Sequence, residues 1–142
     1  MNDTKQGRHL IINGFTEKEY RDILCNETEI ETLLNVIIQI VNMTILIPAR
    51  GVVIDLDQNK KNGDQDCGGV TATAVLTTSH ISIHTWPLHD RFSFDLYSCK
   101  DFDARLVQMY LKLKIGMCGG EIINMPRSHN SDLRKQYEYT WK

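Results

Sequence analysis

The chain has 142 residues, a length that fits one domain with a single hydrophobic core and is short for two. Hydrophobic residues make up 42% of the sequence and charged residues 24%, proportions that are typical of soluble globular proteins and not of disordered or fibrous ones. Sixteen basic against eighteen acidic side chains leave a formal net charge of -2, and the lack of a lysine and arginine cluster argues against a nucleic-acid partner.

The sequence contains neither a membrane span nor an export signal. Its longest apolar run, residues 33–43 (LLNVIIQIVNM), is broken by polar residues, whereas a span needs about 20 mostly apolar residues. The first residues (MNDTKQGRHL) lack the apolar centre of a secretory signal peptide. We therefore expect a cytoplasmic protein with no membrane partner.

The cysteines are widely spaced along the chain. They form no C-x-x-C pair and have no histidine at zinc-finger spacing, so neither a metal site nor a redox motif is indicated. Because disulfides are rare in the cytoplasm, we expect free thiols and no bound metal. The residues concerned are Cys25, Cys67, Cys99 and Cys118.

The first part of the chain predicts one strand followed by helices. Residues 8–15 (RHLIINGF) are typical of a strand, and Thr16 with Glu19 matches a capping box that would start a helix. Asn26 and Thr28 offer a second N-cap. The apolar residues that follow recur at helical spacing and predict a face buried in the core. They are Ile30, Leu33, Leu34, Ile37, Ile38 and Val41.

The middle of the chain predicts a series of strands. Residues 44–47 and 52–56 are short β-prone runs, and the polar residues 57–66 (DQNKKNGDQD) predict a mobile loop. After Gly68 and Gly69, three successive segments are rich in β-branched and aromatic residues. Their closeness along the chain predicts antiparallel hairpins. They are residues 70–77, 80–86 and 91–97.

Another helix and a last strand complete the prediction. Asp103 would cap a helix that runs to Ile115 and stops at Gly116. Residues 121–125 predict the last strand, while the polar segment 126–142 has no predicted place. The helix has one apolar face made of Leu106, Met109, Tyr110 and Leu113.

The order of these elements predicts an α+β fold. We expect a single domain over residues 1–142, a two-layer sandwich in which two helices cover one face of an antiparallel sheet. Strands that follow one another closely favour hairpins over parallel crossovers.

One segment brings together side chains suited to catalysis. Residues 77–87 read TTSHISIHTWP and are followed by DLYSC at residues 95–99, which supplies a hydroxyl, imidazoles and a thiol. Alternation along a strand places His80 and His84 on one face and Ser79 on the other. Because a serine and a histidine at this spacing are more often structural, periodicity alone does not identify a site.

The same segment resembles the core of the short, prokaryotic-type S-adenosylmethionine decarboxylases. The similarity is carried by SHISIHTWP (79–87) and DLYSC (95–99). GRHL (7–10) resembles the opening strand of that family, and GVT (69–71) resembles its Gly-Val-Ser step. The resemblance runs over most of residues 7–125 and implies a pyruvoyl-dependent enzyme made from a proenzyme.

The resemblance implies that the chain cleaves itself between Thr78 and Ser79 and that Ser79 becomes the pyruvoyl group, with no separate cofactor or metal. The Ser79 hydroxyl would attack the Thr78 carbonyl, and elimination from the resulting ester would break the chain. Thr71 would donate a hydrogen bond to the oxyanion, and His84 would remove the Ser79 Cα proton. In the mature enzyme Cys99 would return a proton to the substrate carbon.

The resemblance also implies a substrate and an assembly. The expected reaction converts S-adenosylmethionine into the aminopropyl donor of spermidine synthesis, in a homodimer whose pocket involves both protomers. Trp86, Leu88 and Asp90 are the expected substrate-binding residues. Leu88 occupies the position of the family's ribose-binding glutamate, so His89 or Asp90 would have to accept the ribose hydroxyls.

Departures from the family pattern leave two other functions open. Thr78 stands where the family has glutamate and Thr71 where it has serine, which favours an uncleaved homologue that acts by binding a ligand or partner. Leu88 cannot accept hydrogen bonds, and a ribose hydroxyl buried without a partner would cost about 1–3 kcal/mol. This residue favours a pyruvoyl-dependent decarboxylase of a smaller amino acid, such as ornithine or arginine.

Overall fold

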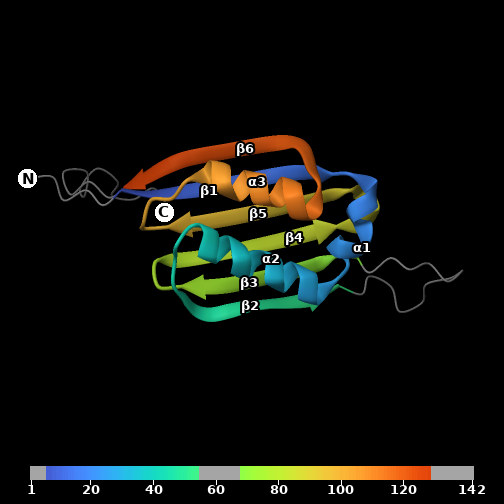
Figure 1. Cartoon of the computed structure of the whole chain (residues 1–142), viewed down its shortest axis with the longest axis horizontal. Helices are drawn as coiled ribbons and strands as arrows, with labels where there is room; N and C mark the ends of the chain where they lie inside the picture. Colours follow the sequence, from blue (N-terminus) through green and yellow to red (C-terminus); the bar gives the residue numbers. More distant parts are fainter. Residues whose placement is uncertain (1–5, 55–67, 129–142) are drawn as a thin grey trace, which may run out of the picture.

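The computed structural model describes residues 6–54 and 68–128, which form an α+β two-layer sandwich (Figure 1). A six-stranded antiparallel sheet has the order β2-β3-β4-β5-β1-β6. The helices α2 and α3 cover one face of this sheet (Figure 1). The predicted fold class is therefore confirmed.

β1 (Gln6–Thr16) confirms the first predicted strand and lies between β5 and β6. The predicted capping box after it is wrong, because Thr16 is the last residue of the strand and its N–H donates to the Asp90 carbonyl at 2.9 Å. The Thr16 hydroxyl is buried without a hydrogen-bond partner in the described part of the chain. The chain continues through the 3-10 helix η1 (Lys18–Tyr20) and the short helix α1 (Arg21–Leu24).

α2 (Glu27–Ile40) begins at the predicted cap, since the Asn26 side chain accepts a hydrogen bond from the Glu29 N–H at 3.1 Å. The predicted apolar face is confirmed, because its residues are buried against the sheet. Burial of this face is the main stabilising term for a helix of this length. The buried residues are Ile30, Leu33, Leu34, Ile37, Ile38 and Val41.

β2 (Ile45–Val53) corrects the prediction of two separate strands in this region. The residues form one edge strand whose register against β3 shifts twice. Pro48, which cannot donate a ladder hydrogen bond, lies in one of the irregular stretches. The predicted polar loop 57–66 lies outside the described residues.

β3 (Val70–Leu76), β4 (Ser79–Trp86) and β5 (Arg91–Ser98) confirm the three predicted strands and pair as antiparallel neighbours. Thr77 and Thr78 form the two-residue turn between β3 and β4. Residues that face the helices are buried and supply much of the core. They are Val70, Ala72, Ala74, Leu76, Ile81, Ile83, Phe92, Phe94 and Leu96.

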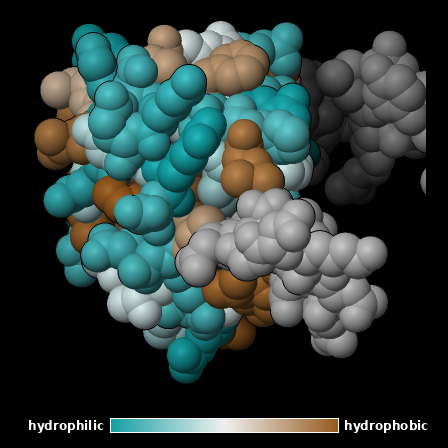
Figure 2. Space-filling model, turned by 90° about the vertical axis from the view of Figure 1, so that its right-hand side faces the viewer, coloured by the Kyte–Doolittle hydropathy of each residue, from teal (hydrophilic) through white to brown (hydrophobic). Residues whose placement is uncertain are grey.

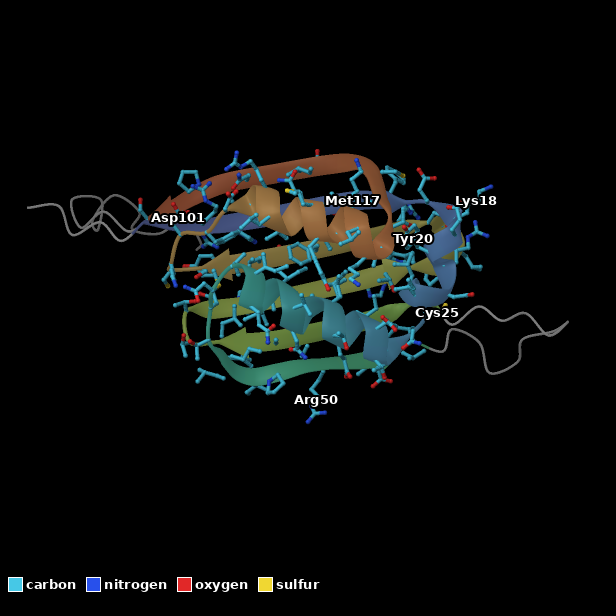
Figure 3. All side chains as sticks on the ribbon, viewed as in Figure 1. Lys18, Tyr20, Cys25, Arg50, Asp101 and Met117 are labelled. Atoms are coloured by element: carbon cyan, nitrogen blue, oxygen red, sulfur yellow. The ribbon has the colours of Figure 1, made fainter. Side chains whose placement is uncertain are left out.

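α3 (Ala104–Ile115) has the predicted ends. The Asp103 side chain accepts a hydrogen bond from the Arg105 N–H at 2.9 Å. Gly116 ends the helix with a φ of 66°, a left-handed conformation that glycine adopts without strain. A side chain at this position would also collide with the ring of Tyr20, which is labelled beside the helix end in Figure 3.

The predicted apolar face of α3 points mostly to solvent, although its Tyr110 packs partly against the core. Leu106, Met109 and Leu113 are 41%, 67% and 69% exposed. A second set of apolar residues at helical spacing packs on the sheet instead. This set consists of Ala104, Val107, Leu111 and Ile115.

β6 (Met117–Ser128) extends the predicted last strand in both directions and pairs with β1. It is an edge strand, which is where a sheet accommodates a residue such as Pro126. Arg8 of β1 ties this edge to the segment after β5, since its Nε donates to Asp101 at 2.6 Å and its guanidinium to Asn124 at 2.9 Å. Asp101 is labelled at this end of the sheet in Figure 3.

The expectation of free thiols is wrong for one cysteine. Cys25, which follows α1, is disulfide-bonded. Cys99 and Cys118 carry free thiols and are exposed. Cys67 lies outside the described residues.

The face of the sheet opposite the helices carries mostly polar side chains, with apolar ones such as Ile11 and Val75 among them, and within residues 6–54 and 68–128 no helix covers it (Figure 1). Its side chains come from alternate positions of the four central strands, and all are exposed or half-buried. This surface is the open face of the sheet. It carries His9, Thr71, Thr73, His80, Ser82, His84, Trp86, Asp95 and Tyr97.

Candidate functional site

The hairpin turn between β3 and β4 carries the first group of candidate residues. Thr78 ends the turn and Ser79 begins β4, and both are half-buried. The Ser79 hydroxyl oxygen lies 3.9 Å from the Cys99 sulfur, because Ser79 is opposite Ser98, the last residue of β5. The hydroxyl and the thiol that were predicted from the sequence therefore lie next to each other.

The Thr78 residue is held by the end of β5. Its carbonyl oxygen accepts a hydrogen bond from the Cys99 N–H at 3.0 Å, and its hydroxyl oxygen accepts one from the buried Ser98 hydroxyl at 2.9 Å. Neither Ser98 nor this backbone donor was predicted from the sequence. A cross-strand contact of this kind leaves no signal in a linear motif, although the DLYSC string contains both residues.

Thr71 and His84 form the second group, at the other end of β4. They are opposite each other in the β3–β4 ladder, and Thr71 Oγ1 lies 2.5 Å from His84 Nδ1. Partial burial of the imidazole lowers the pKa of His84 from its usual 6.5, so the ring is neutral at physiological pH. A neutral imidazole with one nitrogen bonded to a hydroxyl can accept a proton at the other.

Local packing explains the glycine that comes two residues before Thr71. Gly69 has a φ of 104°, and a Cβ there would collide with the backbone of Thr85. The buried Thr85 hydroxyl accepts a hydrogen bond from the Val70 N–H at 2.8 Å and donates one to the Leu24 carbonyl at 2.7 Å. These contacts join β3, β4 and α1 and fix the strand ends at which Thr71 lies.

Trp86 lies at the same end of the open face as His84. The two rings meet edge to face, with centroids 4.2 Å apart. Trp86 also lines a pocket of about 610 Å³ with polar and aromatic walls, a composition suited to a flat ring with polar substituents. Other lining residues are Asn13, Phe15, Arg91, Ser93 and Glu121.

Leu88 and Asp90 lie beyond the end of β4, in and just after the 3-10 helix η2 (Pro87–His89). Leu88 is 49% exposed; Figure 2 views this end of the molecule, where apolar patches interrupt a mostly hydrophilic surface. Both oxygens of Asp90 accept hydrogen bonds from Arg21, at 2.7 and 2.8 Å, which lowers the pKa of Asp90. Substrate hydroxyls would have to compete with this ion pair for the carboxylate.

The two groups of candidate residues do not meet within one chain. Ser79 and His84 are five positions apart on β4, which corresponds to about 16 Å at roughly 3.3 Å per residue. The structure thus brings the predicted catalytic residues together as two pairs, Ser79 with Cys99 and Thr71 with His84, at opposite ends of the strand.

Other polar groups of the described residues pair with one another. His9 Nε2 lies 2.9 Å from Asp95 Oδ1 on the open face, and the Arg127 guanidinium lies 4.0 Å from the ring centre of Tyr97. No group of three or more His, Cys, Asp or Glu within residues 6–54 and 68–128 is arranged to hold a metal ion. In the same segments, no helix has both the length and the apolar character that crossing a bilayer requires.

Known proteins resemble this chain in sequence and in fold. The profile of the S-adenosylmethionine decarboxylase family matches residues 8–128. The S-adenosylmethionine decarboxylase proenzyme of Geobacillus sp. (strain WCH70) is 36% identical over 59 residues, which are 42% of this chain and 48% of that protein. The proenzyme of the same name from Pyrobaculum neutrophilum is 56% identical over 34 residues, 24% of this chain and 27% of that protein.

These alignments span about half of the curated relatives or less. The crystal structure of the adenosylmethionine decarboxylase from Aquifex aeolicus matches with a TM-score of 0.61 and 23% identity, over 87% of this chain and 89% of that one. That likeness concerns the fold, whereas the family profile extends over both pairs of candidate residues. The chain belongs to the S-adenosylmethionine decarboxylase family.

Proposed function

We propose that this protein is a pyruvoyl-dependent S-adenosylmethionine decarboxylase that matures by cleavage between Thr78 and Ser79. The observation that carries the proposal is the 3.9 Å contact between Ser79 Oγ and Cys99 Sγ, beside a Thr78 carbonyl that accepts the Cys99 N–H at 3.0 Å. A nucleophile, the carbonyl that it attacks and an acid for a later step lie at one turn. The product would serve spermidine synthesis in the cytoplasm.

Self-cleavage begins at the Ser79 hydroxyl, which attacks the carbonyl carbon of Thr78. A C–O bond forms, the C–N bond between the two residues breaks, and the Ser79 nitrogen takes up the hydroxyl proton, so that the peptide becomes an ester. Loss of the Ser79 Cα proton then expels the Thr78 carboxylate and cuts the chain. Hydrolysis of the resulting dehydroalanine releases ammonia and leaves the pyruvoyl group.

His84 is the base for the Cα proton and Thr71 its partner. The lowered pKa of His84 keeps the imidazole neutral at physiological pH. With Nδ1–H donated to Thr71 Oγ1, Nε2 is free to accept the proton, and the Thr71 hydroxyl proton remains available for an oxyanion. In this assignment Nδ1 of His84 binds Thr71, Nε2 accepts the Cα proton, and the Thr71 hydroxyl donates to the oxyanion.

The surroundings of Ser79 suit a pyruvoyl group at the start of the second fragment. The residue is half-buried at the sheet end, and its side chain faces the exposed thiol of Cys99. A pyruvoyl ketone supplies the electron sink for decarboxylation. Cys99 would then donate a proton to the substrate carbon, a step suited to a thiol within reach of the reacting atoms.

We propose that the active site is shared between two protomers of a homodimer. Ser79 and His84 lie at opposite ends of β4, about 16 Å apart by strand geometry, which is too far for a proton transfer within one chain. If two copies pack their open faces together in antiparallel orientation, the Ser79 end of one meets the His84 end of the other. Each dimer would then contain two complete sites.

The pocket beside Trp86 is the proposed seat of the nucleoside of S-adenosylmethionine. Its aromatic and polar walls and its volume of about 610 Å³ suit a purine and a sugar. Leu88 still favours ornithine or arginine as the alternative substrate, because the exposed leucine offers no acceptor for ribose hydroxyls. Comparing carbon dioxide release from the three compounds decides between these substrates, and we expect S-adenosylmethionine to be preferred.

Intact-mass measurement of the purified protein tests the proposal as a whole. We expect two fragments, residues 1–78 and a pyruvoyl-blocked fragment of residues 79–142, and a single uncleaved chain for Ser79→Ala. One uncleaved mass for the unmodified protein after long incubation would favour the alternative of a non-catalytic binding homologue.

Mixed dimers test the shared site separately. His84→Ala should not cleave alone, but in a dimer with Cys99→Ala its Ser79 and Cys99 would face an intact His84 of the partner. We therefore expect the His84→Ala chain to be cleaved when the two variants are co-expressed. If that chain stays uncleaved while native mass spectrometry shows mixed dimers, His84 acts within its own protomer and the shared site is wrong.

A further inference from the structure

Ser98 is a buried polar residue beside the cleavage site to which the proposed mechanism gives no role. Its side chain is 0% exposed at the end of β5. Its hydroxyl oxygen accepts a hydrogen bond from the Lys100 N–H at 2.9 Å. The single hydroxyl proton is therefore directed at the other neighbour, Thr78 Oγ1, at 2.9 Å.

The turn that contains the scissile bond is held on both sides. The Thr77 N–H donates to the Thr44 carbonyl at 3.0 Å, and the Ser98 hydroxyl holds the side chain of Thr78. These contacts and the hydrogen bond from the Cys99 N–H together restrict the orientation of the Thr78 peptide unit. Ser98 thus holds the side chain of Thr78, while the N–H of the neighbouring Cys99 holds the Thr78 carbonyl.

The N–H of Cys99 is placed as a donor to the oxyanion that would form at the Thr78 carbonyl. Attack by Ser79 moves negative charge onto the Thr78 carbonyl oxygen, and the Cys99 N–H already lies 3.0 Å from that atom. Donors that are in place before charge develops lower a barrier without reorganisation. Thr71, which was predicted for this role, lies at the other end of β4 in the same chain.

We propose that Ser98 is a positioning residue for self-cleavage: through Thr78 it holds the scissile carbonyl on the Cys99 N–H during the acyl shift. The inference rests on the proposed function. It concerns the first step of self-cleavage, the acyl shift, and the contact that it invokes lies within one protomer. Neither Ser98 nor the Cys99 N–H gains or loses a proton, because the Ser79 hydroxyl proton ends on the Ser79 nitrogen.

Cleavage rates of freshly translated full-length chains test this role. Ser98→Ala and Thr78→Val each remove one side of the hydroxyl contact, and each should slow cleavage roughly tenfold. The double variant should be no slower than either single variant, since both break the same contact. Thr78→Ser, which retains the hydroxyl, should restore most of the rate. Thr77→Val makes the same change at the exposed neighbouring residue of the turn and should have little effect.

Hydroxylamine at neutral pH separates the acyl shift from the later elimination, because it cleaves an ester far faster than a peptide bond. Fragment masses distinguish cleavage after Thr78 from cleavage at the Asn13-Gly14 or Asn62-Gly63 bonds, which hydroxylamine also attacks under harsher conditions. His84→Ala, which is blocked after the ester has formed, should release fragments on addition of hydroxylamine. For Ser98→Ala, hydroxylamine should release few additional fragments, because the ester forms slowly in this variant. Rapid fragment release from Ser98→Ala under hydroxylamine, or slowing factors that multiply in the double variant, would overturn the inference.

Two further outcomes separate this inference from the proposed function. If the unmodified chain never cleaves, the proposed function and the role of Ser98 are both wrong. If the unmodified chain cleaves and Ser98→Ala or Thr78→Val cleaves at the same rate, only the role of Ser98 is wrong. Thermal unfolding of each variant on the Ser79→Ala background would show whether a slow rate reflects a damaged fold.

Discussion

Thr71 and His84 face each other across the β3–β4 ladder, and the hydroxyl oxygen of Thr71 lies 2.5 Å from Nδ1 of His84. A ring nitrogen held in this way fixes the orientation of the imidazole and leaves Nε2 free. The partial burial that lowers the pKa of His84 also keeps Nε2 unprotonated. Geometry and protonation state therefore favour the same role for this histidine.

The pH dependence of self-cleavage should report on His84. Its pKa is lowered from 6.5, so the neutral form persists as the pH falls past that value, and the cleavage rate should fall only at lower pH. Stability changes in the same direction with pH. As the pH falls, the unfolded chain binds a proton at His84 before the folded chain does, so the free energy of unfolding decreases below pH 6.5. Rates measured between about pH 5 and 8 test this, and a half-maximal rate above 6.5 would contradict it.

Cys99→Ala should be cleaved and yet be nearly inactive. Elimination at Ser79 needs a base, whereas the decarboxylated product needs an acid, and the Cys99 thiol lies 3.9 Å from Ser79 Oγ. Fragment masses and carbon dioxide release measured on the same sample separate the two steps. Cys118→Ala is the matched control, because among the described residues it removes a second exposed free thiol. Normal turnover by Cys99→Ala would mean that another group supplies the proton.

Asp90→Asn should lower stability more than it weakens substrate binding. Both Asp90 oxygens are occupied by Arg21, and Asn tolerates the left-handed backbone at this residue, where φ is 52°. Since Arg21 is 43% exposed, solvent screens the ion pair and the loss should be small. Arg21→Gln should lower the Tm by a similar amount, with KM little changed in both. A large rise in KM for Asp90→Asn alone would instead support contact with the ribose.

Leu88→Glu should improve the binding of S-adenosylmethionine. The position is 49% exposed, so the fold tolerates a carboxylate, and a new acceptor for ribose hydroxyls is worth about 1–3 kcal/mol, or roughly five- to 150-fold in KM. Leu88→Met keeps an apolar side chain of similar size and serves as the control. An unchanged KM for Leu88→Glu would mean that the ribose does not reach η2, or that the substrate has no ribose.

Two leucines of α3 should differ sharply in their contribution to stability. Leu111 is 0% exposed and Leu113 is 69% exposed, although both belong to apolar sets at helical spacing. Leu111→Ala should cost about 2–5 kcal/mol, whereas Leu113→Ala should change the free energy of unfolding by about 0.5 kcal/mol or less. Urea unfolding of both variants on the Ser79→Ala background measures this, and equal losses would contradict the observed packing of α3.

Periodicity and caps in the sequence predicted most of the fold. Asn26, Asp103 and Gly116 marked helix ends, because capping depends on side chains next to one another in sequence. The buried face of α3 could not be predicted from spacing, because the helix has two apolar sets with the same spacing. Only contact with the sheet distinguishes Leu111 from Leu113, and that contact depends on distant residues.

The candidate site was predictable as a set of residues but not as an arrangement. The motif identified Ser79, His84 and Cys99, yet their pairing depends on the strand register, which joins Thr71 to His84 and places Ser79 beside Cys99. The role of Ser98 depends on its burial and on a hydrogen bond across strands. Neither property can be read from the residues that flank it in sequence.

β1 lies between β5 and β6 in the sheet, so a break after Thr78 would leave two interlocked polypeptides. The first would contribute β1, β2 and β3, and the second β4, β5 and β6. Because β1 is hydrogen-bonded on both edges to strands of the other polypeptide, neither could dissociate until the sheet came apart. Refolding of each mature protomer would then require two separate molecules to meet, so its yield would depend on protein concentration in a way that folding of a single Ser79→Ala chain would not.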